Sequence, residues 1–476
     1  MSLLLPTSPL EIPELLRKIS SFVATKDAVA CAQVCKVWSD HFASAIWHTI
    51  DFDIHKKLLK TDTTAFARYG HHVRVVKKIK KLHHIRVLLL FNLCRLKRLS
   101  IIMTATQEYY AHVSDLLRRI NKTTQRLEIY QPTSTQVPFF SVDPLLHPST
   151  GATSKLSYLE IQGLTMTRDA FSSLLRNSPA LTTIDIRDST LAMLPGYNRP
   201  HPDEDYYRHH GVIELGAGFG QVFFTEDVPS LLVHFPNLTL WETWDFPTPS
   251  EPSVDKLKSE VTRYCPMLLE LWSRDPSPMA SGMIAQALNN LTTIGVEQRK
   301  LDTELVMAIL HHQETLEYFG TFHDDILLQE SDIVPRVEGG QLEAGWIIQS
   351  IPRLCTRLET LKLPDYEMNM SDIENAKWMC HNLETLFIRI RGLNTKEKID
   401  RAIRLWKRGR PVTVTVTVRE TRSKKEKKSA PSGYQSVNAI PQEDNSIEAR
   451  VARHLLKFRK LRMVWLGWKI HEVHRD

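Results

Sequence analysis

A short phrase of aliphatic residues in L-x-x-L-x-L order recurs through most of the 476-residue chain. It reads KLSYLEIQGL, ALTTIDIRDSTL, NLTTIGVEQRKL, CTRLETLKL, CHNLETLFIRI and KLRMVWLGW at successive places. Its phase is nearly constant, since Leu159 and Ile184 are 25 residues apart and so are Leu361 and Leu386. A period this short predicts one small structural unit per repeat, stacked on its neighbours, because such a unit cannot bury its apolar face alone.

Segments with helical spacing of apolar residues separate these phrases, for example Met283 to Leu288 and Leu305 to Leu310. One strand and one helix in each unit predict an α/β solenoid, a curved parallel sheet with outer helices. Cys265, Cys355 and Cys380 each stand three residues before the first leucine of a phrase. In this the chain resembles irregular, cysteine-containing leucine-rich repeats. A doubly wound sheet also alternates strand and helix and is the competing fold.

The solenoid is expected to cover residues 51–420. Residues 421–446 are too polar to pack, which predicts a flexible insertion. Alternating valines over 412–418 predict a strand before it. Residues 447–476 carry a helical pattern and a last strand phrase, so we expect them to form the final repeat or cap.

The first fifty residues have a different pattern, in which apolar residues recur at helical spacing. Pro13 suits the first turn of a helix, and a stripe follows it through Leu16, Ile19 and Phe22. A second short helix is expected through Ala32, and a third has its apolar face around Trp38. The alternation from Ile50 to Ile54 then predicts a strand.

The order of residues in this segment resembles the F-box motif, namely Ile12-Pro13-Glu14-Leu15-Leu16, Ile19, Phe22, Asp27, Val34-Cys35-Lys36, Trp38 and Trp47. The resemblance covers about forty residues and implies an all-helical F-box over 1–50 that binds a Skp-type adaptor, and through it a cullin. It implies that the residues at the adaptor interface, or bracing it, are Pro13, Leu16, Ile19, Val34, Cys35 and Trp38. Ala28 departs from the motif, which usually has leucine there.

Composition places the chain among ordinary globular proteins, with 42% hydrophobic and 24% charged residues. No apolar run approaches the roughly 18 to 20 residues of a membrane helix, and we expect no membrane partner. The start of the chain lacks the basic residues of a secretory signal. Six cysteines without a CxxC pair predict reduced thiols. These features together predict a location in the cytoplasm, the nucleus or both.

No pattern for catalysis or a cofactor stands out in the chain. The run GAGFGQ at 216–221 matches no phosphate-binding motif and is interpreted as a loop. Histidine doublets recur, but adjacent residues point to different faces of a helix or strand, which is poor geometry for a metal. We expect no catalytic residue, no cofactor and no metal. Together with the F-box resemblance, this implies a non-catalytic subunit, whose contribution is to hold a substrate near activated ubiquitin.

A basic stretch over 71–98 contains nine Lys and Arg residues and no acid. It has two interpretations, a solvated flank of the first repeats or a surface that meets RNA or an acidic protein segment. We favour the flank and do not expect nucleic acid as a partner. A nucleic-acid-binding repeat protein and an adaptor-binding scaffold without a role in ubiquitination stay open as alternatives.

The expected function is substrate recognition in a Skp-cullin-F-box ubiquitin ligase, in ubiquitin-dependent protein degradation. If Leu159 and Ile161 face the core, alternation exposes their neighbours on the concave face of the sheet, and the same parity applies to later strands. Phe387 and Trp465 are the expected anchors, because aromatic residues dominate interface energetics. The substrate-binding residues predicted in this way are Tyr158, Glu160, Asp185, Arg187, Lys362, Phe387, Arg389 and Trp465.

Overall fold

A computed structural model gives the structure of the chain. It describes residues 12–55, 63–104, 106–131, 154–187, 189–192, 207–218, 231–244, 251–274, 278–296, 303–321, 344–409, 444–466 and 470–472. The chain divides into two compact units, Met1–Trp244 with Ser259–Leu268, and Asp245–Lys258 with Leu269–Asp476. Within the described residues, no helix has the length and apolar character needed to cross a membrane.

The amino-terminal part of the first unit is a small cluster of helices, α1 (Pro13–Phe22), α2 (Thr25–Ala32) and α3 (Lys36–Trp47). Pro13 opens α1, where its missing N–H costs no hydrogen bond. The core of the cluster consists of Leu16, Ala28 and Phe42, all fully buried. The three predicted helices are therefore present, around a very small core.

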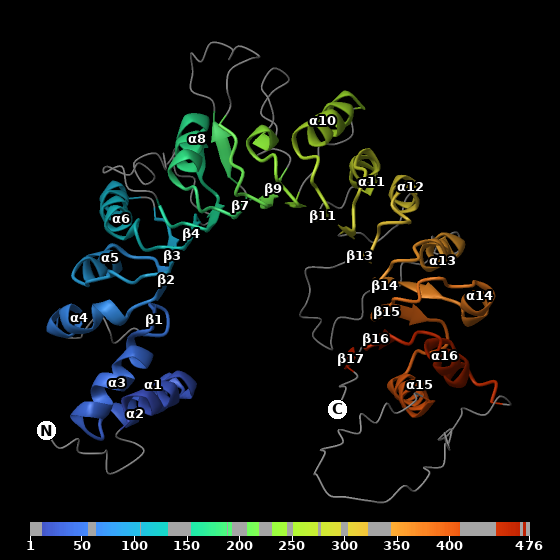
Figure 1. The fold of residues 1–476 in the computed structure, drawn as a ribbon, viewed down its shortest axis with the longest axis horizontal. Helices are drawn as coiled ribbons and strands as arrows, with labels where there is room; N and C mark the ends of the chain where they lie inside the picture. The colour runs from blue at the N-terminus through green and yellow to red at the C-terminus, as the bar shows by residue number, and fades with distance from the viewer. Residues whose placement is uncertain are drawn as a thin grey trace, which may run out of the picture. The chain divides into compact units, whose positions relative to one another are not determined.

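The rest of the first unit is a sheet whose strands follow one another in chain order (Figure 1). Each of these strands pairs in parallel with the next. The strands are β1 (Thr49–Asp51), β2 (Val75–Ile79), β3 (Arg98–Ile102), β4 (Arg126–Tyr130), β5 (Tyr158–Gln162), β7 (Thr183–Arg187), β9 (Glu214–Ala217) and β10 (Leu240–Thr243). The helical segments of this sheet are α4 (Thr63–Tyr69), η3 (Gly70–His72), α5 (Leu82–Leu89), α6 (Gln107–Ile120), α8 (Arg168–Asn177) and η4 (Leu231–His234). A separate two-stranded sheet pairs β6 (Thr165–Thr167) with β8 (Thr190–Ala192).

The second unit repeats this plan with another run of parallel strands in chain order. They are β11 (Glu270–Ser273), β12 (Thr293–Val296), β13 (Tyr318–Thr321), β14 (Thr360–Met368), β15 (Thr385–Ile390) and β16 (Met463–Leu466). The strand β17 (Ile470–Glu472) pairs antiparallel with β16. The helices are α11 (Pro278–Ala287), α12 (Thr303–His311), α13 (Ala344–Leu354), α14 (Met370–Asn375), α15 (Lys396–Gly409) and α16 (Ile447–Leu455), while α10 (Glu251–Tyr264) has residues in both units.

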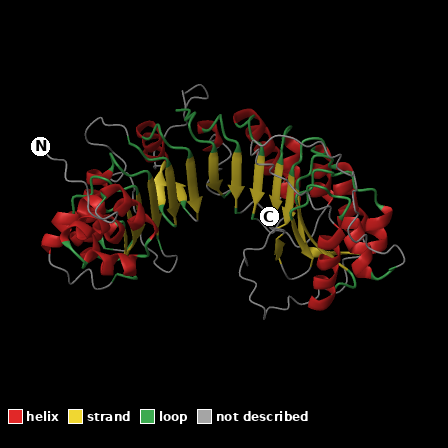
Figure 2. Ribbon diagram, turned by 60° about the horizontal axis from the view of Figure 1, so that its bottom comes forward, coloured by secondary structure: helices red, strands yellow, loops and turns green. Residues whose placement is uncertain are grey.

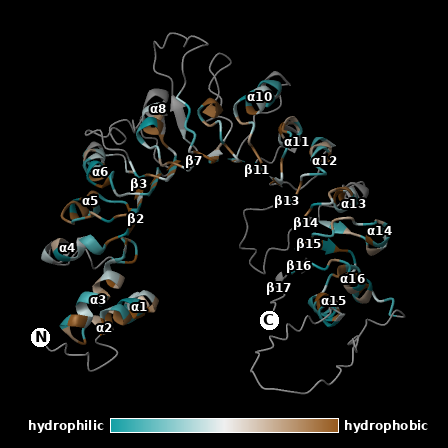
Figure 3. Ribbon diagram, in the orientation of Figure 1, coloured by the Kyte–Doolittle hydropathy of each residue, from teal (hydrophilic) through white to brown (hydrophobic). Residues whose placement is uncertain are grey.

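In each unit the helices lie along one face of the strands (Figure 2). The side chains that meet them form a ladder of buried aliphatic residues at one position in successive strands, such as Leu127, Leu159, Ile184 and Leu215. Hydrophobic and hydrophilic residues alternate along the helices, as expected for helices buried on one side (Figure 3). The predicted fold class, a helical amino-terminal cluster followed by an α/β solenoid, is confirmed. A doubly wound sheet would have helices on both faces.

One detail differs from the sequence-based expectation. Gly216 and Ala217 belong to strand β9, although the glycine-rich run 216–221 was expected to be a loop. A side chain at Gly216 would have no room, because the ring of Trp244 would lie 2.6 Å from its Cβ. The strand expected over 412–418 lies outside the described residues, as does the insertion expected over 421–446 except for its last three residues.

The cysteines that precede the leucine phrases occupy one structural slot, as their spacing suggested. Cys265, Cys355 and Cys380 are fully buried at the base of three different strands. Burial raises the pKa of each thiol to about 12. They act as small core residues, because a thiol with so high a pKa is a poor nucleophile.

Candidate functional site

The face of the first sheet opposite the helices carries a row of acidic residues. Glu128, Glu160 and Asp185 pair in register across β4, β5 and β7. They are only 2%, 7% and 6% exposed, although they point away from the hydrophobic core. Carboxylates this buried need charged or hydrogen-bonding partners.

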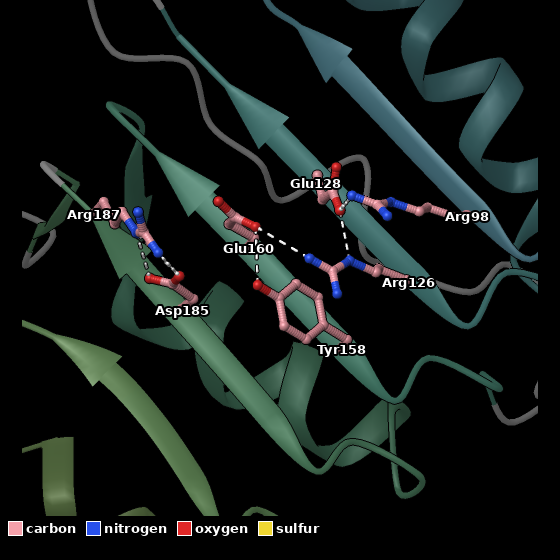
Figure 4. A network of polar contacts seen from close by, with 7 residues as sticks. All are labelled: Arg98, Arg126, Glu128, Tyr158, Glu160, Asp185 and Arg187. Atoms are coloured by element: carbon pink, nitrogen blue, oxygen red, sulfur yellow. Dashed lines mark hydrogen bonds and ion pairs between the residues drawn. The ribbon is translucent and has the colours of Figure 1, made fainter. Parts of the chain in front are cut away.

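Arginines supply those partners (Figure 4). Arg98 Nη2 lies 2.6 Å from Glu128 Oε1, and Arg126 Nε donates to the same oxygen at 2.5 Å. Arg126 Nη2 lies 3.8 Å from Glu160 Oε2, which also accepts a 2.9 Å hydrogen bond from the Tyr158 hydroxyl. The three strands β3, β4 and β5 are thus joined by a polar network as well as by their backbones.

Arg187 forms a second, bidentate pair with Asp185, donating from Nε at 3.1 Å to Oδ1 and from Nη2 at 2.7 Å to Oδ2. Burial raises the pKa of Asp185, against the opposing effect of Arg187. The guanidinium also lies 5.0 Å from the ring of Trp244, as that of Arg126 lies 3.7 Å from the ring of Tyr158. Each arginine is held at one edge by a carboxylate and on its face by an aromatic ring.

This arrangement corrects one expectation. Alternation does place Tyr158, Glu160, Asp185 and Arg187 on the predicted face, but Glu160 and Asp185 are covered by their arginine and tyrosine partners. The charged side chains that are partly exposed here are those of Arg98, Arg126 and Arg187, each 37–38% exposed. The face presents hydrogen-bond donors, because the acceptors beneath are already occupied.

The corresponding face of the second unit is aromatic rather than ionic. Its central row reads Trp272, Gly295, Gly320, Lys362, Phe387 and Trp465 from β11 to β16, each residue paired with the next in register. Lys362 and Phe387 are half-buried neighbours, and Arg389 pairs in register with Glu367 of β14. The side chain of Trp465 lies outside the described part of the structure. The row joins the predicted Lys362 and Phe387 to Trp272, which the sequence-based selection omitted.

A different kind of surface lies on the amino-terminal helices. Six aliphatic or aromatic side chains of this helical cluster, five on the helices and Val34 between α2 and α3, are 38–80% exposed around a core of three buried residues. They are Leu15, Ile19, Phe22, Val29, Val34 and Val37. So many exposed apolar side chains on so small a domain indicate a surface that binds another protein.

Comparison with known families identifies this part of the chain. Residues 13–53 match the F-box-like family model. F-box domains generally bind Skp-type adaptors. A search of curated proteins found no match to the chain.

The residues expected to bind the adaptor have different environments in the F-box-like domain. Pro13, Ile19, Val34 and Cys35 are exposed. Leu16 is fully buried, so its role is to brace the domain rather than to contact a partner. Trp38 is half-buried and stacks on Phe42 with ring centroids 5.6 Å apart.

Sequence reasoning missed exposed residues on the same helices, notably Phe22, which is 80% exposed, and Val37, which is 53% exposed. Phe22 belongs to the apolar stripe that follows Pro13, and a stripe of this kind normally faces a domain's own core. The signal was the number of apolar residues, which exceeds what three short helices can bury.

Helix α3 attaches the F-box-like domain to the first strands. Trp47 stacks on Tyr69 of α4 at 5.5 Å and meets Phe91 edge-on at 6.2 Å. The His48 carbonyl accepts hydrogen bonds from the N–H groups of Arg74 and Val75. The tryptophan therefore packs between the two parts and does not belong to the exposed surface of the helices.

The basic stretch 71–98 is partly neutralised by acids. Lys80 Nζ lies 2.8 Å from Asp53, and Lys78 Nζ lies 3.4 Å from the same carboxylate. The hydrogen bond from Lys80 lowers the pKa of Asp53. Arg86 pairs with Glu108 and Arg98 with Glu128. These pairs favour the solvated-flank interpretation of the stretch over a nucleic-acid surface.

Proposed function

We propose that this protein is the substrate-recognition subunit of a Skp-cullin-F-box ubiquitin ligase. The observation that carries the proposal is the exposed apolar surface on helices that match the F-box-like family. Burying the six side chains against an adaptor removes apolar area from water, at about 25 cal/mol for each Å². The adaptor in turn connects the chain to a cullin.

The rest of the chain presents a substrate, in this proposal through leucine-rich-type repeats. Their strands offer two chemically different faces, one of arginines in the first unit and one of aromatic residues in the second. The packing of Trp47 on Tyr69 and Phe91 supports a fixed geometry between the adaptor-binding helices and the first strands. A fixed geometry keeps a bound protein's lysines at a high effective concentration near activated ubiquitin.

In this proposal the subunit contributes no catalytic residues, and other subunits carry out the covalent steps of ubiquitin transfer. Among the described residues, no group of three or more His, Cys, Asp or Glu side chains is placed to hold a metal. The protein would act in the cytoplasm, the nucleus or both, where cullin ligases meet their substrates.

Affinity capture of the tagged full-length chain from cells tests the proposal. We expect an adaptor, a cullin and a RING subunit to copurify. Recovery of the adaptor alone would favour a scaffold without a role in ubiquitination, and recovery of neither would overturn the proposal. Ile19→Asp and Val34→Asp should abolish capture of the adaptor, because each places a charge on the exposed apolar surface.

A matched control uses an exposed apolar residue elsewhere. Met307 on α12 is 50% exposed, comparable to Ile19 and Val34 at 38% and 64%. Met307→Asp should leave capture of the adaptor and cullin unchanged. Equal loss with this control would mean that the charge acts by unfolding or aggregation rather than at the F-box-like surface.

A further inference from the structure

The aromatic face of the second unit has the features of a preformed site. Its parts are Trp272, Tyr318, Lys362 and Phe387, which we call the aromatic row. Trp272, Lys362 and Phe387 occupy the central position of β11, β14 and β15, and Tyr318 lies two residues before Gly320 of β13. The two intervening central positions are the glycines Gly295 and Gly320.

The glycines leave room for the two rings to pack closely against the backbone. A Cβ on Gly295 would stand 2.2 Å from Cε3 of Trp272, so the indole occupies the space that a side chain would fill. The phenol of Tyr318 covers Gly320 in the same way, with Oη 2.9 Å from the position of a Cβ. Glycine inside a strand often marks such a close approach.

The rings are also held in place. The centroids of Trp272 and Tyr318 lie 5.1 Å apart, and the indole Nε1 donates to Glu270 Oε2 at 3.4 Å. Rigid aromatic side chains bind with little loss of conformational entropy, which favours their use as anchors. The surface therefore exists before any partner arrives.

A single cation lies within the aromatic row. Lys362 is half-buried, and its Nζ lies 5.3 Å from the centroid of the Tyr318 ring. Burial lowers the pKa of this amine. In the part of the chain that the structure describes, no carboxylate lies within ion-pair distance of Lys362. A half-dehydrated ammonium with only a ring beside it gains most from an anion that a ligand brings.

We infer that the aromatic row docks an extended peptide segment of the substrate that carries a large apolar side chain and, a few residues away, an Asp or Glu. The inference rests on the proposed function. The apolar side chain packs on Trp272 and Tyr318, and the carboxylate pairs with Lys362. Three strand intervals separate Trp272 from Lys362, about 14 Å at 4.8 Å each, which an extended peptide spans with about four residues.

Single-stranded nucleic acid also stacks on aromatic rings, but the surroundings disfavour it. Glu317, Glu359 and Glu384 occupy the position immediately before β13, β14 and β15, linked in sequence by backbone hydrogen bonds. Glu270 stands at the first position of β11. A phosphate chain needs a positively charged groove along its whole length, whereas this face presents Lys362 and Arg389, and the marginal Arg357 and Arg462 are paired with Glu317 and Glu384. A peptide with one carboxylate fits that distribution.

A selection from a displayed library of random nonapeptides tests the inference. The full-length chain is the bait, and the variant Trp272→Ala, Lys362→Met is the counter-selection. We expect the enriched peptides to combine a large apolar residue with an acid two to five positions away. No enrichment over the variant, or enrichment of peptides without an acid, would overturn the inference.

Enriched peptides, synthesised with blocked ends, then give the energetic test. Lys362→Met keeps the apolar stem and should weaken binding about tenfold or more, the usual effect of losing a hydrogen bond to a charged group. Replacing the peptide's acid by its amide should cost the same, and the two changes together should cost little more than either alone. Additive losses would mean that the acid meets another residue, and displacement by oligouridylate would favour nucleic acid instead.

Two further variants separate contact from folding. Gly295→Ala should lift the indole from the sheet and weaken peptide binding while Lys362 remains, whereas Met307→Ala on α12 should change nothing. Equal peptide binding by wild-type and Gly295→Ala protein would contradict a role for the Trp272 indole packed against Gly295. Capture of the adaptor and cullin by the same variants is a separate measurement. The inferred docking site can therefore be wrong while the proposed function is right, and the proposed function can be wrong while the docking site is right.

Discussion

The indole of Trp47 stacks on the ring of Tyr69 with centroids 5.5 Å apart and planes 15° apart. Trp47 ends the last helix of the F-box-like domain, and Tyr69 ends the first helix beside the sheet. This contact, together with Phe91 and the hydrogen bonds to the His48 carbonyl, connects α3 to the first part of the sheet. The contact supports a fixed orientation of the F-box-like helices on the first strands.

Because the two rings meet directly, their truncations should not be additive. Trp47→Ala and Tyr69→Ala should each destabilise the protein, and the double variant should show a coupling energy of about 0.5–1.5 kcal/mol. Unfolding by denaturant measures it. Trp47→Ala combined with Phe171→Ala, a buried residue of α8 whose ring contacts His234 and Phe235, should be additive. Zero coupling between Trp47 and Tyr69 would contradict the stacking.

Truncation of Leu16 and of Ile19 on α1 should have opposite effects on stability and on adaptor binding. Leu16 is fully buried, so Leu16→Ala should cost about 2–5 kcal/mol of stability and lose adaptor binding only through unfolding. Ile19 is 38% exposed, so Ile19→Ala should leave the thermal midpoint nearly unchanged and weaken adaptor binding by more than about 1 kcal/mol. Thermal unfolding and titration with the adaptor separate the effects. Stability loss in Ile19→Ala without loss of binding would reverse the assignment.

Glu128 should be the most sensitive member of the polar network. Glu128→Gln removes the charge that faces both Arg98 and Arg126, and we expect a loss of about 2 kcal/mol. This loss of stability is smaller than the loss usually caused by breaking a buried ion pair, because both arginine side chains are partly exposed to water. Ser100→Ala, at the neighbouring position of β3, is the control and should cost less than about 1 kcal/mol. Similar losses in both variants would show that the charge is unimportant.

His454 should make the protein less stable in mild acid. Burial lowers the pKa of its imidazole from 6.5 to about 3, and neither ring nitrogen has a hydrogen-bond partner among the described residues. Below pH 6.5 the unfolded chain therefore binds a proton that the folded chain does not. Stability should fall with decreasing pH, by up to about 1.4 kcal/mol per pH unit, until the folded pKa is reached.

His454→Phe should reduce this slope, since phenylalanine fits between Trp378 and Phe458 and cannot be protonated. Denaturant unfolding of both proteins at pH 7.5, 6 and 5 gives the comparison. Their difference should be constant above pH 6.5 and change below it. Parallel curves over the whole range would mean that His454 is protonated in the folded protein too.

Alkylation should divide the cysteines into two classes. Cys35 and Cys94 are exposed and should react with iodoacetamide at pH 8, while Cys265, Cys355 and Cys380 should react only after unfolding. Burial raises the pKa of the latter three thiols to about 12, which leaves almost no thiolate. Peptide mapping by mass spectrometry checks this. Rapid labelling of Cys355 in folded protein would contradict its place in the core.

The repeat architecture was predictable from sequence alone, because it depends on local periodicity. Leu159 and Ile161 alternate with polar neighbours, so the face that each residue of β5 occupies follows from the pleat of a single strand. The same holds for the F-box-like helices, where Pro13 and the apolar spacing mark helix positions within one element. Residues in one strand or one turn carry this information themselves.

Contacts between strands were decided only by the tertiary structure. Glu160 was expected at the surface, yet Arg126 of the neighbouring strand covers it, and no local pattern shows which side chain of another strand will lie there. The indole of Trp272 lies on Gly295, 23 residues away, because the strand register brings the two together. Leu16 and Ile19 share one apolar stripe, but the small core has room for only the first. Burial of a side chain depends on neighbours that are distant in sequence, and packing alone selects them.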